Sequence, residues 1–319
     1  LARPEPAMVP IGIGDDSAVI AATGSDTVAC TDVLVQDVHF RLDWSSGADI
    51  GRKAAAQNLA DIVAMGATPL TLLVGLCLPR ETEVDWVLDL ADGLSQEAAR
   101  AGATVVGGDI VRGPHIVISV TALGHMDGRI PVRRGGARAH DVVAYTGRLG
   151  MSAAGLMLLQ RGFRSPRSLV NAHRAPEPNY AQALEATRAT AMIDVSDGLV
   201  SDLGHIARAS HVTIDIDSSA LVVSEELAAA ASAFTMDPLP WLLHGGEDHA
   251  FVATFPDALA VPTHWVIIGR VVAGPPAVLV FRPLWQALHS LSVPTCPWVS
   301  SDTWLSAACE LVYSACVLP

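Results

Sequence analysis

Four short clusters of glycine and aspartate constrain this chain more than any other feature. In chain order they read GIGDDS at 12–17, GGD at 107–109, DVSDG at 194–198 and GGED at 245–248. Glycine lets a ligand approach the backbone closely, and clustered carboxylates are natural ligands of hard cations such as Mg²⁺. Any one cluster could be a plain surface turn, since both residue types favour turns. Four of them next to predicted strands indicate one shared site.

The charge balance argues against a nucleic-acid-binding surface. The 319 residues include 33 acidic and 20 basic side chains, which gives a formal net charge of −13. A small anionic ligand is compatible with this charge if metal ions supply the missing positive charge. No G-x-x-x-x-G-K-[ST] segment occurs, so a Walker-type phosphate loop is excluded. The five cysteines include no C-x-x-C pair and are odd in number, which disfavours a disulfide framework.

No segment is typical of a membrane span or a signal peptide. The most apolar run, 62–78, is interrupted by Gly66, Pro69 and Gly75 and indicates a helix end, a turn and a strand. The first residues lack an apolar signal core. We therefore expect a cytoplasmic protein with neither a membrane nor a nucleic-acid partner.

The first half alternates predicted strands and helices, which indicates an α/β or α+β fold. Strands are predicted at 27–35, 70–78, 104–106 and 116–123, and helices at 51–65 and 81–101. The first helix should have Asp49 as its N-cap and Gly66 as the residue that closes it. On this helix Lys53, Gln57 and Asp61 are spaced at i, i+4 and i+8, so they share one face.

The second half continues with a similar alternation. Strands are predicted at 141–146, 212–216, 251–255 and 266–272, and the segment 191–202 is predicted to be a strand that enters a helix at an aspartate-rich turn. Further helices are predicted from 152, after 178 to about 188, and at 224–233, with a loop at 166–178. The basic, glycine-containing segment 129–138 is the expected linker between domains. We therefore divide the chain into domains at 1–137 and 138–275, followed by an atypical tail at 276–319. From 281 onward this tail has no glycine but carries three tryptophans and three cysteines.

Carboxylates at strand ends and glycine turns are the candidate site residues. They are Asp15, Asp16, Asp32, Asp61, Asp109, Asp194, Asp197, Glu247 and Asp248. Converging carboxylates repel one another unless cations neutralise them. Several Mg²⁺ ions would do so and would also hold polyphosphate oxygens during in-line phosphoryl transfer. Arg133 or Arg134 could add a bidentate phosphate contact. Asp15 stays open between a metal ligand and a turn residue, whereas Asp202 and His205 are interpreted as structural.

Six segments, taken in order and spacing, resemble the thiamine-monophosphate kinase family. They are GIGDDSAVI, TDVLVQDVHF, NLADIVAMGATP, GGDIVRGP, IDVSDGLVSDLGHIA and GGEDHAFVATF, and the similarity spans about 12–273. This family is related to aminoimidazole ribonucleotide synthetase, selenophosphate synthetase and a hydrogenase-maturation dehydratase. The resemblance implies an N-terminal α/β domain, a C-terminal α+β domain and a homodimer that packs its N-terminal strands together. It also implies direct phosphoryl transfer from ATP to thiamine monophosphate with several Mg²⁺ ions, which yields thiamine diphosphate.

The resemblance also implies roles for individual positions. The implied Mg²⁺ ligands are Asp16, Cys30, Thr31, Asp32, Asp61, Asp109, Asp194 and Asp197, with Asp32 and Asp197 also implied in catalysis. The implied ATP contacts are Gly108, Arg134 and Ser196, and the implied thiamine-phosphate contacts are His39 and Glu247. Cys30 stands where the family more often has Ser or Thr, so only a backbone carbonyl ligand would survive there.

The chain departs from the family at its end, and two other functions stay open. The usual C-terminal G-[WY]-[DN]-H-F motif, whose aromatic residue stacks on thiamine, does not occur. One alternative is a catalytically weakened homologue that binds ATP and metal or thiamine phosphate. The other is a different ATP-dependent enzyme of the superfamily. Selenophosphate synthetase is disfavoured because an early Cys and a Gly-rich Lys loop are missing, and the cyclo-ligase is disfavoured by the SDGL and GGED segments.

Overall fold

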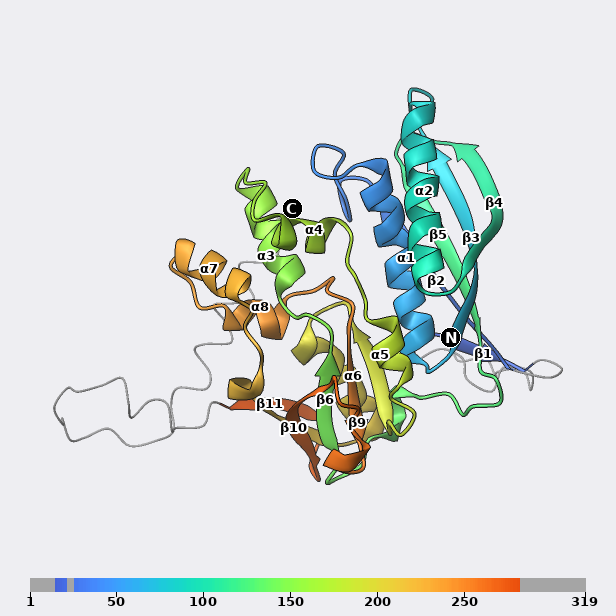
Figure 1. Ribbon diagram of the computed structural model, residues 1–319. Helices are drawn as coiled ribbons and strands as arrows, with labels where there is room; N and C mark the ends of the chain where they lie inside the picture. Colours follow the sequence, from blue (N-terminus) through green and yellow to red (C-terminus); the bar gives the residue numbers. More distant parts are fainter. Residues whose placement is uncertain (1–14, 22–25, 282–319) are drawn as a thin grey trace. The chain divides into compact units, whose positions relative to one another are not determined.

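The protein is represented by a computed structural model, in which the structure of residues 15–21 and 26–281 is described (Figure 1). Residues 12–14 of the first Gly/Asp cluster and the part of the expected tail from 282 onward lie outside the described residues. Within the described ranges the chain forms two β-sheets with helices packed against them. The expected α/β class is therefore confirmed.

The first sheet, within the described residues, has five strands in the order β1-β2-β5-β3-β4. Their bounds are β1 Ala18–Ile20, β2 Thr27–Val35, β3 Thr68–Leu78, β4 Thr104–Arg112 and β5 Val117–His125. Only β3 and β4 are parallel neighbours, and the other pairs are antiparallel. Helices α1 (Gly47–Ala64) and α2 (Val84–Arg100) lie side by side along this sheet (Figure 1). Buried and more exposed residues alternate along β3 and β5, so the face under the helices forms the core.

Helices α1 and α2 approach each other at glycine positions. A Cβ atom on Gly51 would lie 2.2 Å from the carbonyl oxygen of Leu90, and one on Gly93 would lie 2.1 Å from that of Ala48. Side chains cannot replace hydrogen at such distances, so glycine permits this close packing. The packing fixes the orientation of α1, which carries the candidate residue Asp61.

A capping box begins α1 four residues earlier than expected. The Ser46 hydroxyl accepts a hydrogen bond from the Asp49 backbone at 3.1 Å, and the Asp49 carboxylate accepts one from the Ser46 backbone at 3.0 Å. The prediction that Asp49 is the N-cap was therefore wrong, because Asp49 is the third residue of the helix and Ser46 caps it. The predicted end of the helix is confirmed, since Gly66 follows it with φ of +73°.

The second sheet, again within the described residues, has six strands in the order β11-β8-β10-β6-β9-β7. Their bounds are β6 Val142–Thr146, β7 Ala191–Val195, β8 Thr213–Asp217, β9 Ala250–Phe255, β10 Val266–Val272 and β11 Ala277–Phe281. The helices of this half are α3 Met151–Gln160, α4 Arg167–Arg174, α5 Tyr180–Leu184, α6 Leu199–Ser210, α7 Glu225–Ala233 and α8 Leu239–His244. Strand β7 is an edge strand of this sheet, and its five residues are all buried.

The structure differs from the expected elements at several points, and three of them change how a predicted segment is interpreted. Helix α4 occupies the middle of the segment 166–178 that was predicted as a loop, because Leu169 and Val170 give it a buried face. Gly108 and Asp109 lie inside β4, whereas the prediction ended this strand before them. Strand β11 pairs in parallel with β8, so the second sheet continues beyond the boundary expected at 275. The β-prone sequence of 277–281 is the signal that was missed.

Candidate functional site

Three aspartates from distant parts of the chain converge on one point. Asp16 precedes β1, Asp61 lies in the last turns of α1, and Asp194 lies in β7. Each offers a carboxylate oxygen, and these oxygens all lie within 4.8 Å of one another. The group thus joins residues from both halves of the chain, and we call it the acidic cluster. All three residues were predicted metal ligands.

The pKa values of Asp16 and Asp61 are raised because these carboxylates are buried and repel one another. Burial raises the pKa of Asp16 to about 7, and the charge of Asp194 adds to this effect although Arg134 opposes it. Burial and the charges of Asp194 and Asp16 raise the pKa of Asp61 well above its ordinary value. Burial also raises the pKa of Asp32, and the charge of Asp194 adds to this effect. A cation at this point would relieve the repulsion.

The donor set of the acidic cluster fits a hard divalent cation. It consists of carboxylate oxygens alone, which is the ligand type that Mg²⁺ and Ca²⁺ prefer, whereas Zn²⁺ favours nitrogen and sulfur ligands. The three carboxylates lie close together and repel one another, and binding of such an ion would remove this repulsion. The expectation of Mg²⁺ is therefore compatible with the residues present.

Arg134 connects the basic segment to the first Gly/Asp cluster. Its Nη2 donates a hydrogen bond to Asp16 Oδ1 at 2.8 Å, and its Nε donates one to Asp16 Oδ2 at 3.3 Å. Its backbone N–H donates to Asp15 Oδ1 at 2.7 Å, and Arg133 Nε lies 3.4 Å from Asp15 Oδ2. Asp15 therefore holds the basic segment in place, while Asp16 alone of the two joins the acidic cluster.

Three consecutive predicted ligands on β2 point to different faces of the sheet. Cys30 Sγ contacts the backbone carbonyl of Asn58 on α1 at 3.3 Å, and the Asp32 backbone N–H donates to the Asn58 side chain at 3.0 Å. The Thr31 hydroxyl instead donates to the Val120 carbonyl at 3.0 Å, on the more exposed face. Side chains alternate along a strand, so Cys30 and Asp32 face α1 and the Thr31 hydroxyl does not. Burial raises the pKa of the Cys30 thiol, which disfavours a thiolate ligand.

A second group of possible ligand atoms lies at the turn after β7. Asp197, Asp202 and His205 each offer an atom within 4.8 Å of the others. The Asp202 carboxylate accepts a hydrogen bond from the Asp197 backbone at 3.0 Å, and burial raises its pKa to about 7. Gly198 shapes the turn with φ of +107°, and a Cβ there would lie 2.8 Å from the His244 carbonyl carbon. Asp202 and His205 were interpreted as structural, although their i, i+3 spacing on α6 already placed them on one face.

The GGED turn lies directly against the end of β7. The Glu247 backbone N–H donates to the Ser196 carbonyl at 2.8 Å, and the His249 backbone N–H donates to the Val195 carbonyl at 3.0 Å. Glu247 and His249 have φ of +62° and +48°, which is uncommon for residues with side chains. Such strain persists where surrounding contacts enforce it, often at functional sites. The turn thereby brings Glu247 and Ser196, two predicted contact residues, together.

His249 is a site residue that the sequence did not reveal. It is 5% exposed, and its Nδ1 donates a hydrogen bond to Asp194 Oδ2 at 2.9 Å. Burial by itself would lower the pKa of His249, but the hydrogen bond and the charge of Asp194 raise it overall. A positive imidazolium would offset part of the negative charge of the acidic cluster. No spacing rule linked this histidine to an aspartate 55 residues earlier.

The predicted substrate contacts His39 and Glu247 meet at a buried lysine. Lys53 Nζ lies 2.6 Å from Glu247 Oε2 and donates to the His39 carbonyl at 3.0 Å. The His39 ring accepts a hydrogen bond from the Val35 backbone at Nδ1, 3.0 Å away. The ring proton of a neutral His39 is therefore on Nε2.

Gly108 and Asp109 are not brought to the acidic cluster within one chain. They lie on β4, which is separated from β2 by β5 and β3. Three strand spacings correspond to roughly 14 Å. Asp109 is exposed, and its carboxylate accepts a hydrogen bond from the next backbone N–H at 2.9 Å. A Cβ on Gly108 would lie 1.8 Å from the Val74 carbonyl oxygen, which explains glycine at this position by packing.

Two domain models of one protein class match most of the chain. The model "AIR synthase related protein, N-terminal domain" matches residues 14–126, and "AIR synthase related protein, C-terminal domain" matches residues 138–281. The two sheets and the acidic cluster between them thus define a two-domain protein related to AIR synthase.

Individual relatives narrow this class. A thiamine-monophosphate kinase of Mycobacterium tuberculosis is 51% identical over 89% of this chain and 85% of its own length. That of Corynebacterium glutamicum is 44% identical over 81% of this chain and 80% of its own length. A solved structure described as AaThiL complexed with AMPPCP and TMP superposes with a TM-score of 0.80 at 34% identity, covering 84% of this chain and 87% of that chain. The chain belongs to the thiamine-monophosphate kinase family and is an enzyme of the kinase class.

One further observation bears on the expected location. Among the described residues, no helix combines the length and apolar character that crossing a membrane requires.

Proposed function

We propose that this enzyme phosphorylates thiamine monophosphate with ATP, yielding thiamine diphosphate by direct in-line transfer. The convergence of Asp16, Asp61 and Asp194 beside Arg134 is the observation that carries the proposal. It provides carboxylates for divalent cations next to a guanidinium suited to phosphate. The relatives named thiamine-monophosphate kinase and the neighbour described with AMPPCP and TMP support the choice of substrates.

The residues have separate roles in this proposal. Asp16, Asp61 and Asp194 would hold Mg²⁺, and Asp32 and Asp197 would complete the coordination or orient the reacting phosphates. Bound Mg²⁺ would supply positive charge that holds phosphate oxygens and neutralises charge developing during transfer. Phosphoryl transfer needs no covalent nucleophile from the protein, because positioning and electrostatics lower its barrier.

Direct contacts to the substrates come from nearby donors. Arg134 is 20% exposed, so its guanidinium is accessible while it pairs with Asp16. We assign it, with Ser196, to the ATP phosphates. We assign His39 and Glu247 to thiamine monophosphate, with His39 Nε2–H as a phosphate donor. The Glu247 carboxylate suits the positively charged thiazolium ring rather than the phosphate.

The outer face of the first sheet supports the expected homodimer. Val33 on β2, Leu73 on β3 and Val111 on β4 are 45%, 42% and 52% exposed on the face that turns away from α1 and α2. Apolar side chains from three strands of one open sheet favour burial against a second copy. A second copy would also bring another Asp109 and Gly108 close to this face. Light scattering should give the mass of a dimer, and Leu73→Asp should shift it toward the monomer.

A coupled assay of ADP release tests the proposed reaction. We expect Mg²⁺-dependent ADP release only when thiamine monophosphate is present, and loss of this release in Asp197→Asn. Mg-ATP binding without any turnover would instead support the catalytically weakened homologue. The absence of both binding and turnover would overturn the proposal. The cytoplasm, where ATP is available, is the location that this reaction implies.

A further inference from the structure

Lys53 is the one lysine in the sequence, and it is buried where the two halves of the chain meet. Its side chain is 2% exposed. Its Nζ donates to Glu247 Oε2 at 2.6 Å, to the His39 carbonyl at 3.0 Å and to the His173 carbonyl at 3.4 Å. An ammonium group has three protons to donate, so each proton has an acceptor. A buried charge is costly unless it is fully compensated in this way.

These contacts link Lys53 to both residues assigned to thiamine monophosphate. It holds the carboxylate of Glu247, which projects from a turn at φ of +62°. It also holds the backbone of His39, whose ring is oriented by its own hydrogen bond from the Val35 backbone. Without the ammonium group, nothing else among the described contacts ties the His39 loop to the GGED turn.

We propose that Lys53 is a positioning residue that sets the distance between His39 and Glu247 and thereby determines binding of thiamine monophosphate. This inference rests on the proposed function. Lys53 engages Oε2 of Glu247, and Oε1 has no hydrogen-bond partner among the described residues. The Glu247 side chain is 35% exposed, so it is accessible to a substrate. Lys53 itself is too buried to touch a substrate.

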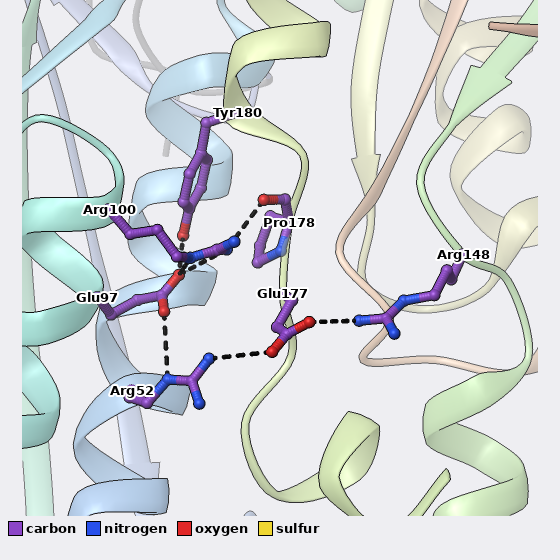
Figure 2. A network of polar contacts seen from close by, with 7 residues as sticks. All are labelled: Arg52, Glu97, Arg100, Arg148, Glu177, Pro178 and Tyr180. Carbon is purple, nitrogen blue, oxygen red and sulfur yellow. Dashed lines mark hydrogen bonds and ion pairs between the residues drawn. The ribbon is translucent and has the colours of Figure 1, made fainter. Parts of the chain in front are cut away.

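The neighbouring Arg52 offers a matched control on the same helix. Its side chain also joins α1 to the second half, with Nη2 lying 3.4 Å from Glu177, and its Nε lies 3.5 Å from Glu97 on α2. Figure 2 shows that this network continues from Glu177 to Arg148 and from Glu97 to Arg100 and Tyr180. None of its members is a residue assigned to substrate. Arg52 and Lys53 thus both connect the two halves, and only Lys53 connects the substrate contacts.

Steady-state kinetics of three variants separates positioning from general stabilisation. We expect Lys53→Met to raise KM for thiamine monophosphate at least tenfold and to change KM for ATP less than twofold. Lys53→Arg keeps the charge and should recover part of the loss. Arg52→Met should leave both KM values within twofold of the wild type. Equal effects of Lys53→Met on the two substrates, or an unchanged KM for thiamine monophosphate, would overturn the inference.

The unmodified protein provides a second measurement that does not depend on folding of the variants. Acetic anhydride followed by mass spectrometry reports modification of the one lysine. Saturating thiamine monophosphate should slow acetylation of Lys53 at least threefold, because bound substrate stabilises the pairing with Glu247. ATP alone should have no such effect, and equal protection by both would contradict positioning. If the wild type shows no thiamine-monophosphate-dependent ADP release, the proposed function itself is wrong. The results with the Lys53 variants test only the role of Lys53, so the two failures can be distinguished.

Discussion

Arg134 donates two hydrogen bonds to Asp16, at 2.8 and 3.3 Å, although 118 residues separate them in the chain. The Asp16 side chain is 1% exposed, and burial raises its pKa to about 7 despite this pairing. Arg134 is therefore the nearest positive charge for a carboxylate that also faces Asp61 and Asp194. Arg134, which was expected to bind ATP, thus also compensates the charge of the acidic cluster.

Replacing Arg134 should destabilise the protein in a manner that depends on pH and on Mg²⁺. In Arg134→Met, Asp16 is left as a buried charge without a partner, which typically costs about 3 kcal/mol. An acid with a raised pKa in the folded state adds stability at low pH, and this stability is lost as pH rises from about 4 to about 7. The decrease in the free energy of unfolding of Arg134→Met relative to the wild type, measured in urea, should therefore be larger at pH 8 than at pH 5.5. Added Mg²⁺ should reduce this decrease at pH 8. A loss that is the same at both pH values would contradict this account.

Removing one carboxylate from the acidic cluster should separate stability from activity. Asp61→Asn removes a charge whose pKa is raised by burial and by Asp194, so the metal-free protein should melt at a higher temperature than the wild type at pH 8. The rise in melting temperature on adding Mg²⁺ should disappear, and ADP release should fall about 100-fold or more. The exposed Asp85 on α2 gives the control, since Asp85→Asn should change none of the three quantities by much.

Much of the framework of this site could be predicted from the sequence. Strand and helix periodicity predicted most elements, and the aspartates of the ordered motifs include all three members of the acidic cluster. Asp61 followed from its place on the face of α1 that also carries Gln57. The predictions of strands and helices succeeded because they depend on local patterns along the chain.

Other features depend on contacts that local patterns do not encode. The strand order β2-β5-β3-β4 separates Asp109 from Asp32, and no motif indicates this order. His249 acquires its role through a contact with β7 that forms only in the folded sheet. Thr31 and Asp32 are neighbours in sequence, yet pleating sends their side chains to opposite faces.

The network in Figure 2 contains a buried glutamate, Glu97, and an exposed one, Glu177, whose contributions to stability should differ. Glu97 has a fully buried side chain and accepts hydrogen bonds from Tyr180 at 2.8 Å and Arg100 at 2.9 Å. Glu177 is 49% exposed and bridges Arg52 and Arg148. Glu97→Gln should lower the free energy of unfolding by about 2 kcal/mol, because Tyr180 and the partly exposed Arg52 and Arg100 lose their contacts with a buried carboxylate. Glu177→Gln should cost less than about 1 kcal/mol. Urea unfolding measures both, and equal losses would refute the role of burial.

Glycine at 108 should be required for strand packing, whichever ligand approaches it. A Cβ on Gly108 would lie 1.8 Å from the Val74 carbonyl oxygen on the neighbouring strand. Gly108→Ala should force β3 and β4 apart and lower the free energy of unfolding by about 1–3 kcal/mol. Gly75 on β3 is the matched control, because its Cβ would make an ordinary contact of 3.7 Å with Ser119. If thermal unfolding shows Gly75→Ala and Gly108→Ala to be equally stable, a clash with the Val74 carbonyl does not explain the glycine at position 108.

His173 should make the protein sensitive to acid. Burial, together with the positive charge of Lys53, lowers the pKa of His173 from 6.5 to about 4. Between these values the unfolded chain binds a proton that the folded chain does not, so stability should fall as pH decreases from 6.5 to 4. This difference in pKa corresponds to a loss of about 3 kcal/mol in the free energy of unfolding once the pH is below 4.

A variant should isolate this contribution. His173→Asn places an uncharged acceptor near Ser152, whose hydroxyl lies 3.1 Å from the His173 ring, so the local contact can persist. The variant should be less stable than the wild type at pH 7 and approach it, or exceed it, at pH 4.5. His264→Asn, at an exposed position, should follow the wild-type curve throughout. Parallel curves for His173→Asn and the wild type between pH 7 and 4.5 would show that His173 does not couple folding to protons.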